Sequence, residues 1–323
     1  MAELVDWRYA QSTASLLGKT GPKCSATQAG EMVRSLRQLA EAAGEHVTAV
    51  TELDVALPLA PVRVVDRQDW VAVNAAGFQA VIEPALARHS KKSKQGTLIR
   101  TVSSATSGMQ LGAAMALVSS RVLGQYELFS TTPGQLLLVA PNILSAEQKL
   151  DVDPHDFRLW VCLHEVTHQL QFTAVPWLRS YFLSELEALL STRSPLELLR
   201  SEAKRQQLSA ITALMTLVEG HAEYVMDAVG PHIVPTVEVI RKKFDARRRS
   251  GNPVQQVLRY LLGVEHKLRQ YVEGKKFVTS VVDAVGMAGF NTVWRDATTL
   301  PTRAELAQPE VWLARVRPAV ALG

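Results

Sequence analysis

Apolar residues recur at intervals of three and four along most of the chain, a spacing that places them on one face of a helix. Met32, Leu36 and Leu39 give one such series. The same spacing predicts helices over 25–50, 70–86, 153–175, 184–190, 195–229 and much of 235–271. Gly230 and Pro231 predict the end of the helix that begins near 195, because glycine and proline commonly follow helix ends.

Two short apolar segments, 125–129 and 135–139, have the length and composition of strands. Five residues that end in a Pro-Gly pair separate them, which is a turn of hairpin length. The segment 57–65 contains two prolines and predicts an extended connector. The predicted fold class is therefore mostly α with a small β-sheet near the middle of the chain.

One segment carries recognisable chemistry, because His164, Glu165 and His168 form the pattern H-E-x-x-H. Residues four apart on a helix share one face, so both imidazoles can reach a single metal ion. Glu165 then faces the open side of that ion. This is the layout of a zinc hydrolase. The alternative is a pair of core histidines that are hydrogen-bonded to backbone groups.

The surroundings of the motif predict a helix with defined ends. Asp153 suits the N-cap, Pro154 suits the first helical position, and Asp156 adds an acid to the first turn. Pro176 predicts the end of the helix. An apolar series places the histidines on an inward-facing stripe, where an imidazole needs a partner. That series is Phe157, Val161, His164, His168 and Phe172.

A zinc hydrolase needs a third protein ligand and an open position for water. The segment V-E-G-H-A-E-Y at 218–224 supplies the candidates. Glu219 is the preferred ligand, and Glu223, one turn later, would accept a hydrogen bond from a motif histidine. His221 competes for the ligand role, since it and Glu219 cannot face one ion from a regular helix. Gly220 indicates a close approach to a neighbouring element.

These residues define a hydrolytic mechanism. Zinc lowers the pKa of a bound water and polarises a carbonyl group, while Glu165 acts as general base and returns the proton to the leaving amine. Stabilisation of the oxyanion needs hydrogen-bond donors that follow the third ligand. The candidates are Tyr224, His232, Tyr260 and Tyr271. Hydrolysis of a peptide or amide bond is the predicted reaction.

Composition and charge exclude several other classes of protein. The 323 residues are 47% hydrophobic, which is ample for a core, and the net charge is +4. Basic residues gather at 88–94 and 241–249, but Phe244 is the one Phe, Tyr or Trp among them, so solvated surfaces are favoured over nucleic-acid sites. The uncharged segment 101–120 is too polar for a membrane span. Gly108 and Gly112 instead favour a buried helix that approaches a neighbour closely.

Two cysteines, Cys24 and Cys162, are present, and no C-x-x-C pair could hold a structural zinc. A disulfide is not indicated, and Cys162 is expected to be a packed thiol. The first residues include acidic side chains and lack the basic and apolar regions of a signal peptide. A cytoplasmic location is therefore expected.

Several segments resemble the actinobacterial zincin-like metallopeptidase family. They are G-Q-Y-E at 124–127, L-L-V-A-P-N-I at 137–143, D-F-R-L-W at 156–160 running into H-E-V-T-H, and A-V-P-W-L at 174–178. Shorter similar segments at 6–7, 65–67 and 289–291 extend the resemblance over nearly the whole chain. It implies a zincin-like architecture and metallopeptidase activity. The most similar subgroup is described as associated with biosynthesis of a deazaflavin coenzyme.

V-E-G-H-A-E-Y is also similar to the N-E-G-F-A-x-Y segment of gluzincin aminopeptidases, whose glutamate is the third zinc ligand. This likeness implies that Glu219 is the ligand. Val218 and His221 stand where those enzymes have Asn and Phe.

The predicted protein is a zinc metallopeptidase with a helical N-terminal region, 1–123, and a zincin-like catalytic region, 124–323, unless the two form one continuous domain. Its expected cofactor is Zn²⁺, and its expected partner is a peptide or protein substrate rather than nucleic acid or a membrane. The sequence leaves the oligomeric state open. The alternative function is a zincin-fold module that binds a protein or peptide with little or no catalysis. Hydrolysis of a small amide in coenzyme metabolism is a weaker third possibility.

Overall fold

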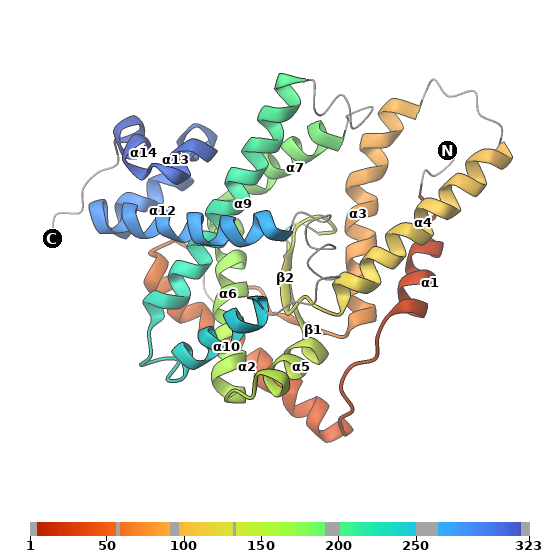
Figure 1. Ribbon diagram of the computed structural model, residues 1–323, viewed down its shortest axis with the longest axis horizontal. Coiled ribbons are helices and arrows are strands. Elements are labelled where there is room, and N and C mark those ends of the chain that lie inside the picture. Colours follow the sequence, from red (N-terminus) through yellow and green to blue (C-terminus); the bar gives the residue numbers. More distant parts are fainter. Residues whose placement is uncertain are drawn as a thin grey trace. The chain divides into compact units, whose positions relative to one another are not determined.

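Helices make up most of the chain in the computed structural model, which describes residues 5–55, 59–90, 97–131, 134–190, 201–249 and 264–317 (Figure 1). The elements in chain order are α1 (Trp7–Leu17), α2 (Ala26–Thr51), β1 (Arg63–Val65), α3 (Arg67–Ser90), α4 (Thr97–Ser119), β2 (Gly124–Glu127), β3 (Gln135–Val139), α5 (Ala140–Leu150), α6 (Pro154–Ala174), α7 (Pro176–Leu190), α9 (Glu202–Val229), α10 (Val237–Arg249), α12 (Val264–Phe290), η1 (Asn291–Trp294), η2 (Ala297–Thr299), α13 (Arg303–Ala307) and α14 (Pro309–Val316). The predicted fold class, mostly α with a small β-sheet, is confirmed.

The described residues divide into two compact units, and each unit is assembled from three stretches of sequence. The first unit draws on 1–38, 60–146 and 183–204. The second unit draws on 39–59, 147–182 and 205–323. Neither unit corresponds to a contiguous range such as 1–123 or 124–323, because segments distant in the sequence pack together within each.

The first unit contains a three-stranded sheet in the order β1-β3-β2. β2 runs antiparallel to β3, and Gln125 is paired with Leu137. This is the hairpin that the sequence predicted, with β2 shifted slightly toward the N-terminus. β1 runs parallel to β3 and lies inside the expected extended connector. Three residues are too few for an apolar pattern to distinguish a strand from a connector.

α1 packs along α4 in the first unit (Figure 1). Two glycines of α4 allow the backbones to approach closely. A Cβ atom added to Gly108 would lie 2.3 Å from the backbone oxygen of Asp6. One added to Gly112 would lie 2.3 Å from the backbone oxygen of Ala10. The predicted close approach of this helix to a neighbour is therefore confirmed. None of the described helices has both the length and the apolar composition that crossing a bilayer requires.

In the second unit, α9 and α12 cross at two glycines. A Cβ atom on Gly220 would lie 2.1 Å from the carbonyl carbon of Gly274. A Cβ atom on Gly274 would lie 2.1 Å from the backbone oxygen of Thr216. The two backbones are thus in direct contact, which fixes α9 at the residue next to Glu219. The close approach expected at Gly220 is confirmed.

Candidate metal centre

The helix that carries the motif, α6, begins where the sequence predicted. Asp153 is its N-cap and accepts a hydrogen bond from the backbone N–H of Asp156 at 2.9 Å, with Pro154 as the first helical residue. The carboxylate of Asp156 accepts hydrogen bonds from the backbone N–H and the hydroxyl of Thr236, at 2.8 and 2.7 Å. These bonds tie the start of α6 to the segment before α10. The helix ends at Ala174, and Pro176 begins α7.

The central turns of α6 are buried on every face. Between Leu159 and Gln171 every residue is buried except His164 and His168, whose side chains are 20% and 12% exposed. The predicted inward-facing stripe is therefore wrong in one respect. Packing encloses these central turns on all sides, and the two histidines are the most exposed side chains in this stretch. Solvent reaches this part of α6 at the motif.

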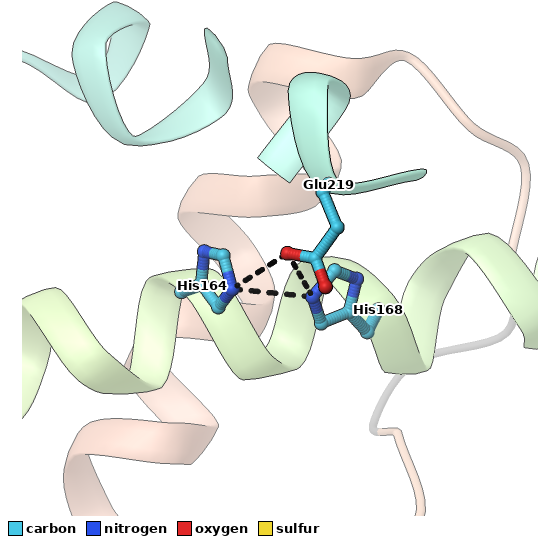
Figure 2. Close-up of side chains that lie close together, drawn as sticks. All are labelled: His164, His168 and Glu219. Carbon is cyan, nitrogen blue, oxygen red and sulfur yellow. Dashed lines mark hydrogen bonds and ion pairs between the residues drawn. The ribbon is translucent and has the colours of Figure 1, made fainter. Parts of the chain in front are cut away.

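Three side chains converge at this point, two from α6 and one from α9 (Figure 2). The Nε2 atoms of His164 and His168 lie 3.2 Å apart. The Oε2 atom of Glu219 lies 3.5 Å from Nε2 of His164 and 3.6 Å from Nε2 of His168. Ligands about 2.0–2.1 Å from a tetrahedral zinc ion stand about 3.3–3.4 Å from one another. The three atoms already have nearly that spacing.

One oxygen of the Glu219 carboxylate lacks a hydrogen-bond partner among the described residues. This oxygen, Oε2, is buried, and its distances to the two imidazoles are too long for strong hydrogen bonds. A buried charged oxygen without a donor is costly. A cation at the centre of the three atoms would satisfy it, so the residues fit a metal ion.

The protonation of the cluster leads to the same conclusion. Burial would lower the pKa of His168, but Glu219 and other polar neighbours raise it to about 9. Burial would raise the pKa of Glu219, but the two histidines hold it well below its ordinary value. The cluster therefore binds positive charge even when only protons supply it. Two histidines and one glutamate are a donor set that catalytic zinc sites use.

Glu165 is buried beside the cluster, with 8% of its surface exposed. Burial raises the pKa of its carboxyl, the charges of His164 and His168 lower it, and Glu219 raises it again, so that the pKa lies above its ordinary value. All three members of the cluster thus act on this carboxyl. Glu165 therefore lies close to the three converging side chains, and its role as general base stays a prediction.

The outer ring nitrogens of the two histidines have different partners. Nδ1 of His164 lies 3.3 Å from the sulfur of Met226 on α9. Nδ1 of His168 lies 3.0 Å from Oε1 of Gln171, one turn later on α6. Sequence reasoning did not single out Gln171. The available signal was its spacing, because a polar residue three positions after His168 lies on the same helix face.

Glu223 does not have the role expected from the sequence. Its carboxylate accepts a hydrogen bond from Arg241 at 3.3 Å, and not from a motif histidine. Arg241 on α10 also forms an ion pair with Asp227, one turn after Glu223. The Arg241 guanidinium thus pairs with both Glu223 and Asp227. An ion pair between α9 and α10 takes the place of the expected hydrogen bond to the cluster.

His221 lies away from the cluster, so Glu219 is the residue of this segment that meets the histidines. The side chain of His221 is fully buried, and its Nδ1 lies 3.0 Å from Nε2 of Gln171. Its ring packs against Phe290 and Trp294, with centroid distances of 5.1 and 5.7 Å. Burial, followed by the charge of His168, lowers the pKa of His221 to about 3. The ring is therefore neutral.

The four expected oxyanion donors have separate locations. Tyr224 is half-buried on α9, and burial together with the charge of Asp283 raises its pKa. His232 is exposed in the turn after α9. No hydrogen bond within the described ranges joins either side chain to the cluster. Tyr260 and the side chain of Tyr271 lie outside the described residues. Their role as oxyanion donors stays a prediction.

Cys162 and the second basic run contribute to packing. Cys162 is fully buried, and burial, followed by the charge of Glu165, raises the pKa of its thiol, as expected for a packed side chain. Within 241–249, Phe244 contacts Trp160 of α6 edge-on, with ring centroids 5.1 Å apart. This run thus includes part of the interface between α6 and α10 as well as solvated residues. The side chains of 88–94 lie outside the described residues.

Comparison with known proteins agrees with a metallopeptidase architecture. The family described as zincin-like metallopeptidase matches residues 5–313. Among solved structures, the chain is similar to the crystal structure of "a putative hydrolase with a novel fold" from Chloroflexus aurantiacus. The two are 30% identical with a TM-score of 0.74, and the match covers 97% of this chain and 99% of that chain. No curated protein matches the chain.

Proposed function

This chain belongs to the zincin-like metallopeptidase family, and from that membership we propose that it is a zinc-dependent peptidase that hydrolyses peptide bonds. Its metal ligands are His164, His168 and Glu219. The observation that carries the proposal is the convergence of these three side chains, whose ligand atoms lie 3.2–3.6 Å apart.

The exposure of the cluster supports a catalytic site over a structural one. A structural zinc site is closed by four protein ligands, whereas a catalytic site has three and keeps one position for water. The side chains of His164, His168 and Glu219 are 20%, 12% and 22% exposed. The other residues of α6 from Leu159 to Gln171 are buried. Water and substrate can therefore approach from the side that these three side chains leave open.

Zinc bound there would supply two effects, a lowered pKa for a water molecule and polarisation of the substrate carbonyl. Glu165 does the proton transfer. Its carboxylate takes a proton from the attacking water as the oxygen–carbon bond forms. The same carboxyl then gives that proton to the leaving nitrogen as the carbon–nitrogen bond breaks. Glu165 suits this role because it follows a ligand directly and is not a ligand itself.

The proposal is tested by separating metal binding from hydrolysis. Purified protein should contain about one zinc per chain, measured by mass spectrometry, as expected for a single three-ligand site. Glu165→Gln should keep the zinc and reduce cleavage of a peptide library by about 10²–10⁴-fold, because it removes the general base. Glu310→Gln, the same change at an exposed position of α14, should leave both unchanged.

Other outcomes of the same experiment would contradict the proposal. Hydrolysis that does not depend on Glu165 would exclude the mechanism. Zinc binding with peptide capture but no cleavage would favour the peptide-binding module. Cleavage of small amides in place of peptides would favour a role in coenzyme metabolism.

We propose two finer assignments. The sequence resemblance supports membership of the actinobacterial subgroup described as associated with biosynthesis of a deazaflavin coenzyme, and the family membership supports a peptide or protein as the substrate. The segments 124–127, 137–143 and 156–160 support the first assignment.

A further inference from the structure

Gln171 lies behind the cluster, and its hydrogen bonds decide which end of its amide faces which neighbour. The side chain is fully buried on α6. One end of the amide lies 3.0 Å from the backbone oxygen of Val218 on α9. A backbone carbonyl oxygen can only accept, so the atom that faces it must be the amide nitrogen. The amide oxygen therefore faces His168.

This orientation decides where His168 carries its proton. Oε1 of Gln171 can only accept, and it lies 3.0 Å from Nδ1 of His168, so Nδ1 carries a hydrogen. A neutral imidazole with its hydrogen on Nδ1 has its lone pair on Nε2. Nε2 is the atom that points toward His164 and Glu219 (Figure 2). Gln171 thus selects the form of His168 that can bind a metal.

His221 takes the second hydrogen of the same amide. Its Nδ1 lies 3.0 Å from Nε2 of Gln171 and must accept, which places the ring hydrogen on Nε2. That Nε2 atom has no hydrogen-bond partner among the described residues, and the ring packs against Phe290 and Trp294. Burying a polar imidazole among apolar side chains costs free energy unless its nitrogens are hydrogen-bonded. Among the described residues, the bond to Gln171 is the one hydrogen bond that the His221 ring makes.

We propose that Gln171 and His221 form a positioning pair for the metal centre. His221 holds the amide of Gln171, and Gln171 fixes the ring orientation and tautomer of His168. The inference rests on the proposed zinc site. α9 thus acts on both ring nitrogens of His168. Glu219 lies near Nε2, and His221, two residues later, bonds to the Gln171 amide that meets Nδ1.

The first test removes the amide. Gln171→Met keeps a side chain of similar length and loses all three hydrogen bonds. Zinc affinity, measured by competition with a chromophoric chelator, should fall by about 10–100-fold, the usual effect of losing a partner of a metal-ligating histidine. The control is Thr167→Val, which removes a buried hydroxyl of α6 that donates to the backbone oxygen of Leu163. It should keep the wild-type affinity, even if the melting temperature falls.

The second test needs no metal. In metal-free protein labelled with ¹⁵N-histidine, the Nδ1 proton of His168 should give a slowly exchanging NMR signal, because it is buried and bonded to Gln171. Gln171→Met should remove that signal, and Thr167→Val should keep it. A signal that is unchanged in Gln171→Met would overturn the proposal. If wild-type protein shows the signal but binds no zinc, the proposed function fails while the hydrogen bond to His168 is upheld.

The third test asks whether His221 acts through Gln171. His221→Phe fits a ring of similar size beside Phe290 and Trp294 and removes the acceptor. It should lower zinc affinity less than Gln171→Met does. The double variant should bind zinc as Gln171→Met does, because residues that act in series are not additive. Losses that add in the double variant would overturn the pairing.

Discussion

The two helices that supply the cluster are held in place by different physical means. α6 is positioned by polar groups near its start, with Asp153 as the cap and Asp156 bonded to Thr236. α9 is positioned by steric contact, because Gly220 and Gly274 bring its backbone against α12. A paired ligand on one helix needs only local geometry, whereas a single ligand from a second helix depends on how the helices pack. The position of Glu219 relative to the two histidines therefore depends on the contact between α9 and α12.

Removal of the proposed metal ligands should have the largest effect. It compares the pair of histidines on α6 with the single glutamate on α9. His168→Ala removes one of the two proposed ligands on α6, and Glu219→Ala removes the single proposed ligand on α9. Each should lower zinc affinity by more than about 100-fold, since loss of an outer partner alone costs 10–100-fold. Chelator competition measures the affinity.

Their effects on metal-free protein should differ. Glu219→Ala removes the carboxylate that raises the pKa of His168 to about 9, so that the pKa should move down toward its ordinary value. NMR titration of His168 in metal-free protein checks this. An unchanged titration in Glu219→Ala would mean that the carboxylate of α9 does not face the histidine in solution.

The crossing of α9 and α12 should give the next largest effect. In Gly220→Ala the new Cβ atom would lie 2.1 Å from the carbonyl carbon of Gly274, so the helices must separate. We expect unfolding free energy to fall by about 1–3 kcal/mol, which is the cost of overpacking. Zinc affinity should fall with it, because Glu219 moves with α9. Denaturant unfolding and chelator competition measure the two effects.

A matched control comes from another helix. At Gly30 an added Cβ atom would lie 3.6 Å from the end of the Arg34 side chain, an ordinary contact. Gly30→Ala should therefore stabilise the protein by about 0.5–1 kcal/mol, the helix preference of alanine over glycine. If Gly220→Ala behaves like Gly30→Ala, the proposed dependence of Glu219 on the crossing is wrong.

The same difference explains how much could be read from the sequence. The motif, the Asp153 cap and the end of α6 before Pro176 are local patterns, and each was predicted. Glu219 was preferred over His221 by helix geometry, and the structure brings Glu219 to the histidines. The role of Glu223 was wrong, because its partner Arg241 comes from α10 and no local spacing reveals it. Gln171 was missed because its importance depends on Val218 and His221, far along the chain.

The local sequence pattern also did not predict how fully the central turns of α6 are buried. Periodicity indicated one inward stripe, but the central turns are enclosed by several elements at once, and an apolar pattern cannot count how many neighbours a helix will have. β1 was likewise invisible, since three residues become a strand only when β3 lies beside them.

The smallest effect should come from the polar end of α6, and its pH dependence distinguishes it from the glycine crossing. Burial would raise the pKa of Asp156, but hydrogen bonds from Thr236, with a smaller contribution from His155, hold it below the ordinary value. A carboxyl whose pKa is lower in the folded protein stabilises the fold above its unfolded pKa of about 4, and that stabilisation is lost as the pH falls toward the folded pKa. Asp156→Asn should therefore destabilise the protein at pH 7, by about 1 kcal/mol for a weakened charged hydrogen bond. The difference from wild type should shrink toward zero at pH 3. Gly220→Ala, whose cost is steric, should have the same effect at both pH values, measured by denaturant unfolding. A pH-independent loss in Asp156→Asn would mean that α6, like α9, is held by shape and not by charge.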